Sequence, residues 1–208
     1  MKPHTPTFKR LGLSHNWQNI YQPNCKSEKE NILYCHTIDK VIESLGPSIL
    51  HHVIQIKAPI VKISIITQSK AFESKAGLIA NRIREKIDLK PSISITVVRT
   101  PLHYPKYVAL SCSKQIRGKM NYRSVITNIL NQIISSGALG CKIRISGRLR
   151  GAEMSTSELF GKGLCPLNTL NYNISYHFEH IKMPYGKLGL KVYINNGYKD
   201  IKLIKELQ

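Results

Sequence analysis

The chain has 208 residues and 23.6 kDa, with 42% hydrophobic residues, which is enough for one large or two small domains with a buried core. Lysine and arginine total 31 against 12 acidic residues, a net charge of +19 that only adds self-repulsion within a folded domain, so we expect a polyanionic partner. No run approaches the roughly 18 apolar residues of a membrane-spanning helix, and five scattered cysteines, an odd number, indicate a reducing compartment rather than a disulfide framework.

Residues 1–36 show no hydrophobic periodicity and are predicted to form an extended basic arm. The segment lacks the apolar stretch of a secretory signal, and its first acidic residue is Glu28. Its basic residues, among them Lys9 and Arg10, either lie along phosphates or belong to a solvated tail.

Residues 37–103 follow the order helix, strand, strand, helix, strand, which is typical of a small α+β unit. Thr37 is predicted to cap the first helix, and Gly46-Pro47 to end it. The β-branched runs 52–57 and 61–67 predict two strands. A helix is expected over 75–88, and the alternation over 92–97 predicts a half-buried strand.

Residues 104–208 predict a second α+β unit with an antiparallel sheet. Apolar residues recur at helical spacing over 122–136, and Gly137 follows as a C-terminal stop. In the strand 141–146, Ile143 and Ile145 face the core while Lys142 and Arg144 face out. Two more strands are predicted over 170–178 and 187–194, where apolar and polar residues alternate. Pro184 and Gly186 lie in the turn between them.

Catalytic and metal-binding patterns are missing from the sequence. The 12 carboxylates form no cluster, and there is neither a Cys-x-x-Cys pair nor a Gly-x-x-x-x-Gly-Lys loop. We therefore expect no enzyme, no cofactor, no metal ion, no small-molecule substrate and no membrane association. A small nuclease is the enzymatic alternative, and it would need the clustered carboxylates that this sequence lacks.

Between Asp88 and Glu153 the chain contains no acidic residue. The basic residues of this interval are Lys90, Arg99, Lys106, Lys114, Arg117, Lys119, Arg123, Lys142, Arg144, Arg148 and Arg150. Arg148 and Arg150 are flanked by Gly147 and Gly151, which let the backbone approach a phosphate that the arginines can grip. A solvated strand edge is the alternative, but so one-sided a stretch favours RNA or DNA.

Three blocks resemble small-subunit ribosomal protein three in order and spacing. Ser146-Gly-Arg-Leu-Arg-Gly-Ala-Glu153 resembles the family signature Ser-Gly-Arg-Leu-x-Gly-Ala-Glu. Pro166-Leu-Asn-Thr-Leu170 is similar to Pro-Leu-x-Thr-Leu, and Tyr185-Gly-Lys-Leu-Gly-Leu-Lys-Val-Tyr-Ile194 to Tyr-Gly-x-x-Gly-x-Lys-Val-x-Ile. Arg10-Leu-Gly12 matches a shorter element near the start.

The resemblance implies a type II KH-like domain over 37–103 and the C-terminal ribosomal protein three domain over 104–208. In place of the family's Gly-x-x-Gly loop this chain has Ser74, Lys75, Ala76 and Gly77, which lacks the first glycine and puts single-strand clamping in doubt. In relatives a basic cluster on the long helix lines the mRNA entrance. Of the aligned Arg123, Ser124 and Thr127 only Arg123 is charged, so a weaker grip on mRNA is expected.

The implied function is a structural constituent of the small-subunit head that binds rRNA, borders the mRNA entry channel and contacts proteins ten and fourteen of the same subunit. The expected rRNA-binding residues are Lys142, Arg144, Arg148, Arg150, Arg117, Lys119, Lys9 and Arg10. Isoleucine occurs 28 times and lysine 22 times against nine arginines, as AT-rich codons produce, which favours a mitochondrial origin with a plastid as the alternative. A free KH-type RNA-binding protein or chaperone outside the ribosome is the alternative function.

Overall fold

The computed structural model describes residues 5–21, 28–46, 48–57, 60–72, 74, 76–87, 89–118 and 120–198. The chain divides into a large unit, residues 1–16 and 100–208, and a small unit, residues 17–99. The predicted arm over 1–36 is therefore not one segment, because its beginning packs with the large unit and its end with the small one. No helix among the described residues is both long and apolar enough to cross a membrane.

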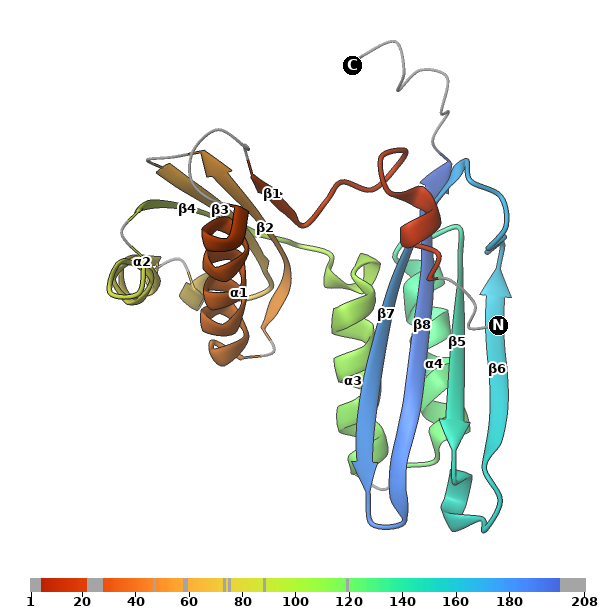
Figure 1. Cartoon of the computed structure of the whole chain (residues 1–208). Helices are drawn as coiled ribbons and strands as arrows, with labels where there is room; N and C mark the ends of the chain where they lie inside the picture. The colour runs from red at the N-terminus through yellow and green to blue at the C-terminus, as the bar shows by residue number, and fades with distance from the viewer. Residues whose placement is uncertain are drawn as a thin grey trace. The chain divides into compact units, whose positions relative to one another are not determined.

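The small unit is a four-stranded sheet with two helices (Figure 1). Its elements are β1 (Asn19–Tyr21), α1 (Glu28–Ser44), β2 (Ile49–Lys57), β3 (Ile60–Thr67), η2 (Lys70–Phe72), α2 (Ala76–Arg84) and β4 (Lys90–Val97). The strand order is β1-β2-β3-β4, with β2 antiparallel to β3 and the two outer pairings parallel. From α1 onward the elements follow the predicted order, and β1 was missed because three residues carry no periodic signal.

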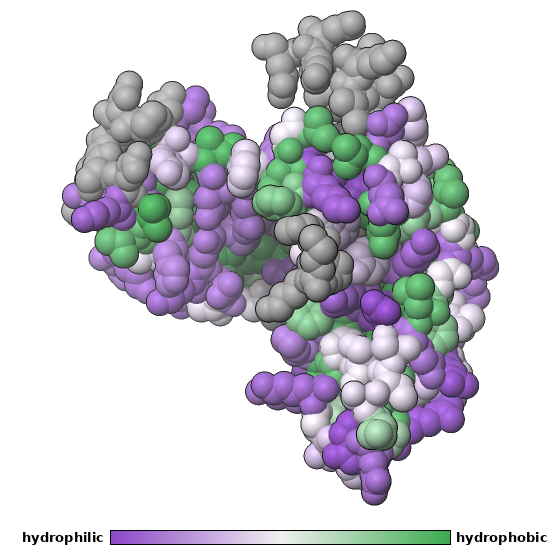
Figure 2. All heavy atoms as spheres, turned by 45° about the vertical axis from the view of Figure 1, so that its right-hand side comes forward, coloured by the Kyte–Doolittle hydropathy of each residue, from purple (hydrophilic) through white to green (hydrophobic). Residues whose placement is uncertain are grey.

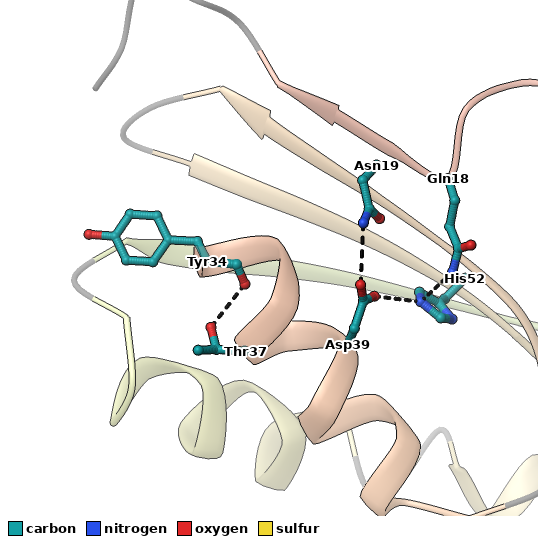
Figure 3. Close-up of polar contacts among 6 residues, drawn as sticks. All are labelled: Gln18, Asn19, Tyr34, Thr37, Asp39 and His52. Carbon is teal, nitrogen blue, oxygen red and sulfur yellow. Dashed lines mark hydrogen bonds and ion pairs between the residues drawn. The ribbon is translucent and has the colours of Figure 1, made fainter. Parts of the chain in front are cut away.

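Alternation along the strands places Ile54, Ile63 and Ile65, all fully buried, against apolar residues of α1 and α2. Helix α1 begins at Glu28, so the prediction that Thr37 caps it is wrong. Thr37 lies inside the helix, where its hydroxyl donates to the carbonyl of Tyr34 at 2.9 Å, a bond that Ser and Thr make in helix interiors (Figure 3). The first turns were missed because buried Asn31 interrupts the apolar stripe.

A polar cluster joins β1 to the rest of the small unit (Figure 3). Asp39 of α1 accepts a hydrogen bond from the amide of Asn19 at 3.3 Å and lies 2.8 Å from Nε2 of His52 on β2. The amide nitrogen of Gln18 lies 2.8 Å from the same ring nitrogen. The short strand β1 is thus held by side chains of both α1 and β2 as well as by its backbone.

The large unit is an antiparallel sheet covered by two helices (Figure 1). Its elements are η1 (Phe8–Arg10), η3 (Pro101–His103), α3 (Pro105–Arg117), α4 (Tyr122–Ser135), β5 (Gly140–Gly147), η4 (Leu149–Gly151), β6 (Thr156–Gly163), β7 (Tyr172–Met183) and β8 (Gly186–Tyr198). The strand order is β6-β5-β8-β7. The predicted α+β class with an antiparallel sheet is confirmed, and β6 was missed because its residues alternate too weakly in hydrophobicity.

The core of the large unit lies between the sheet and its two helices. Helix α4 contributes the predicted apolar stripe, in which Ile126 and Ile133 are fully buried, and Asn121 caps it by accepting from the backbone N–H of Arg123. Ile143 and Ile145 of β5 face this core, as predicted.

Arg10 fixes the N-terminal segment to the large unit. Its side chain is 0% exposed, and the guanidinium donates to the carbonyls of Tyr172 at 2.8 Å, Pro6 at 3.0 Å, Thr169 at 2.6 Å and Leu167 at 3.3 Å. Burial lowers the pKa of this group, but an arginine stays protonated in proteins. The cation is therefore compensated by backbone dipoles from two segments more than 150 residues apart.

We expect Arg10→Leu to lower the free energy of unfolding by about 2–4 kcal/mol, because it removes charged hydrogen bonds and leaves buried carbonyls unpaired. Urea denaturation followed by circular dichroism measures the change. Lys9→Leu is the matched control, since Lys9 is exposed and a surface substitution changes stability by about 0.5 kcal/mol or less. Equal stabilities of the two variants would contradict the anchoring role.

Candidate nucleic-acid interface

The sheet of the large unit has one face that α3 and α4 do not cover, which we call the open face (Figure 1). Because side chains alternate along β5, Lys142 and Arg144 point away from the core residues Ile143 and Ile145. Their partners across the strands are Tyr193 and Lys191 of β8. β7 continues the same face with Tyr176, Phe178, His180 and Lys182.

Charge on the open face has one sign in the described strands. Glu158 of β6 pairs with Ile145, and Glu179 of β7 pairs with Leu190, so both carboxylates belong to the helix-covered side. The open face carries Lys142, Arg144, Lys182, Lys187 and Lys191. A surface of cations without carboxylates suits the phosphates of a nucleic acid.

Aromatic rings lie among these cations. The rings of Tyr176 and Tyr193 have centroids 5.1 Å apart, and Nζ of Lys191 lies 5.9 Å from the centre of the Phe178 ring. Burial raises the pKa of both tyrosines, so they stay neutral at physiological pH. Figure 2 shows hydrophobic areas intermixed with hydrophilic ones on the visible surface. Base-stacking surfaces in RNA-binding proteins combine the same two kinds of side chain.

Lys9 lies beside the open face, in the same cavity lining as Tyr176, from which it is far apart in the sequence. A cavity of about 150 Å³ is lined by Thr5, Pro6, Lys9, Leu167, Asn168, Tyr176, Lys191 and Tyr193. Of the neighbouring pair predicted to bind rRNA, Lys9 is exposed while Arg10 is buried. The structure thus makes Arg10 a part of the scaffold rather than of the surface.

Lys142 and Arg144 differ in exposure and in their hydrogen bonds within the protein. Nζ of Lys142, which is half-buried, donates to the carbonyl of Cys165 at 2.8 Å, and this bond ties the loop before β7 to β5. Arg144 is exposed. We therefore rank Arg144 above Lys142 as a phosphate ligand on this face.

The signature segment forms a tight turn after β5. Gly147 has φ +129°, and a Cβ there would lie 2.8 Å from the Leu188 side chain, so glycine is required. Leu149 is buried, while Arg148 and Arg150 are exposed on either side of it. Arg150 itself has φ +56°, an uncommon conformation for a residue with a side chain. The turn thus leaves both arginines exposed, and their predicted contact with rRNA phosphates stays a prediction.

Arg123, the residue aligned with the mRNA entrance, is paired with a carboxylate. Its guanidinium donates to Glu158 at 2.8 and 3.3 Å, and the hydroxyl of Tyr122 donates to the same carboxylate at 3.1 Å. These bonds hold the pKa of Glu158 below its usual value and raise that of Arg123. Sequence reasoning missed this partner, because Glu158 lies 35 residues away on an unpredicted strand.

The remaining predicted residues are placed only in part. Arg117 is exposed at the end of α3. Lys119 and Lys75 lie outside the described residues. Ser74 donates to the carbonyl of Ala71 at 3.0 Å, while Ala76 and Gly77 form the start of α2, so the second half of the degenerate loop belongs to the helix.

The thiols and acids form no reactive site among the described residues. Cys35, Cys112, Cys141 and Cys165 are free and buried, and burial raises the pKa of Cys112 to about 12 and that of Cys141 to about 11. Such thiols are protonated at neutral pH and unreactive. Within the described part of the chain no three His, Cys, Asp or Glu side chains gather as metal ligands.

Comparison with known proteins identifies relatives among ribosomal proteins. Residues 112–194 match the family model of the ribosomal protein S3 C-terminal domain. The chain is 29% identical over 199 residues to the small ribosomal subunit protein uS3 of Wolinella succinogenes, covering 92% of this chain and 84% of the relative.

Two further relatives carry the same name. The protein of Helicobacter pylori strain Shi470 is 28% identical over 199 residues, covering 92% of this chain and 85% of its own length. The protein of Caldanaerobacter subterraneus is 35% identical over 127 residues, which cover 59% of this chain and 58% of the relative. These relatives indicate a structural, non-enzymatic protein, in agreement with the sequence prediction. The chain is thus similar to the ribosomal protein S3 C-terminal domain over residues 112–194, and to small ribosomal subunit proteins uS3 over 92% of its length.

Proposed function

We propose that this protein is a structural constituent of the small-subunit head and binds rRNA through the open face and the signature turn. The observation that carries the proposal is the open face, where cations and aromatic rings of the described strands share a surface and the carboxylates of these strands lie on the other side. Phosphates of folded rRNA neutralise the cations, and the rigid sheet provides a complementary surface. No bond is made or broken.

We further propose that α4 borders the mRNA entry channel, as the resemblance implies. Glu158 neutralises Arg123 at the start of this helix, and the aligned Ser124 and Thr127 are uncharged. The protein therefore exerts a weaker electrostatic pull on incoming mRNA than a relative with three cations there.

The remaining proposals concern location and partners. The bias toward isoleucine and lysine supports a mitochondrial ribosome, with a plastid ribosome as the alternative. Proteins ten and fourteen of the same subunit are the proposed neighbours. The small unit acts as a type II KH-like domain whose degenerate loop serves mainly as structure.

An epitope-tagged chain is expected to co-sediment with small ribosomal subunits from its native compartment, because rRNA neutralises its surplus charge. Sucrose-gradient fractionation at moderate salt measures this. A chain found only in the light fractions, as a soluble monomer or bound to other RNA, would instead favour the free RNA-binding protein.

Arg144→Ala is expected to weaken binding to a small-subunit rRNA transcript and to reduce the slope of log affinity against log salt by about one. Filter binding at several salt concentrations measures the slope. Lys162→Ala is the matched control: it also removes one exposed cation, but Lys162 pairs with Cys141 on the helix-covered side and donates to Asn131. An unchanged slope for Arg144→Ala, or equal losses for both variants, would exclude the open face as the rRNA surface.

Glu158→Gln is expected to free Arg123 for RNA and to steepen the salt dependence by about one phosphate contact. Glu153→Gln, which removes an exposed carboxylate outside this pair, is the control. In a translation assay through an mRNA stem-loop, Arg123→Ala should slow passage modestly and Glu158→Gln should speed it. If neither variant changed the rate of passage, the proposal that Arg123 borders the entry channel would be wrong.

A further inference from the structure

A cavity of about 420 Å³ opens at the end of the large unit where η4 and the β7–β8 turn lie (Figure 1). Its lining includes Ile116, Tyr122, Arg148, Arg150, Met183 and Tyr185. Four segments thus meet around it: the end of α3, the start of α4, the signature turn and the β7–β8 hairpin. Its size lies within the range of roughly 300–1,000 Å³ that is usual for ligand sites.

Apolar and aromatic side chains form most of the wall. Leu149 and Leu188 are buried at 5% exposure each, whereas Met120 and Tyr185 are 58% and 64% exposed. Exposed side chains of this kind beside a buried apolar base form an open slot. A flat ring entering the slot would gain apolar burial and aromatic stacking.

Two arginines complete the wall, and both are held in position. Arg148 donates to the carbonyl of Ala152 at 2.8 Å and to that of Tyr185 at 3.4 Å. The guanidinium carbon of Arg150 lies 5.6 Å from the centre of the Tyr122 ring. If a flat base occupied the apolar slot, these two guanidinium groups could bind the phosphates on either side of it.

The nearby carboxylate does not cancel these charges. Glu158 is hydrogen-bonded to Arg123 and to the hydroxyl of Tyr122, and its charge also acts on Arg150, so one carboxylate faces two arginines and leaves a net positive charge. The turn therefore keeps a positive charge beside a slot for a flat ring, a combination that favours a nucleotide over an apolar protein side chain.

We propose that this cavity holds one unpaired base of RNA, stacked on the exposed ring of Tyr185, with the flanking phosphates on Arg148 and Arg150. The inference rests on the proposed RNA binding and adds to it a site that reads unpaired bases. Phosphate contacts on the open face do not depend on pairing, whereas this cavity admits only a base free to leave its helix.

The chain's four methionines allow a direct test. Met120 and Met183 line the cavity, whereas Met154 is 81% exposed and lies outside the lining, which makes it an internal reference. In protein labelled with ¹³C-methyl methionine, adenosine 5′-monophosphate should shift the signals of Met120 and Met183 through the ring current of the base. Ribose 5-phosphate should not, and Met154 should stay unchanged with both.

An RNA pair tests the same site in its proposed context. A hairpin with one bulged adenosine should bind at least about fivefold more tightly than the fully paired hairpin, since a stacked base contributes roughly 1–3 kcal/mol. Tyr185→Ala should abolish this preference. Tyr198→Ala, which removes an exposed tyrosine at the end of β8 and outside the cavity lining, should retain it.

Each result separates this inference from the proposed function. Equal, salt-dependent binding of both hairpins by the unaltered protein would overturn the base site and leave rRNA binding intact. Tighter binding of the free nucleotide than of the bulged hairpin would overturn it in favour of a nucleotide site. If neither probe shifts Met120 and Met183, the cavity takes no base and the inference is wrong, even where RNA binds elsewhere.

Discussion

The one-sided cover of the large sheet is the constraint on which the interface depends. Strand alternation sends Ile143 and Ile145 under the helices, so Lys142 and Arg144 must lie on the opposite face. The same rule sends Glu158 and Glu179 to the helix side. Because side chains alternate along each strand, the cations of β5, β7 and β8 gather on the face away from the helices, where a polyanion would relieve their mutual repulsion.

The basic residues of this chain differ in role according to their surroundings: some are part of the scaffold and others are free to contact a partner. Arg10 occurs in a basic segment but is buried among four backbone carbonyls, whereas Arg144 occurs in a strand and is exposed. Arg123 is intermediate, because it is exposed but bonded to Glu158. Net charge therefore overstates the number of cations that can contact phosphate.

The signature turn links scaffold and surface. Gly147 allows the chain to pass close to Leu188, Leu149 inserts into the core, and the two arginines between the glycines stay outside. The turn also walls a cavity next to Tyr122 and Tyr185. The residues that fix the backbone of the turn and the arginines proposed to bind RNA thus lie in one short segment.

The sequence alone determined the helix over 122–135, the inward and outward faces of β5 and the basic character of the signature turn, because local periodicity and charge are written into neighbouring residues. It failed for β1, β6 and the start of α1, where short or polar segments carry no periodic signal. Only the tertiary structure decided that Arg10 is buried, that Glu158 neutralises Arg123, and that Lys9 lies with Tyr176 and Lys191. Each of these depends on strand register and loop packing between residues far apart in the chain, which no local pattern specifies.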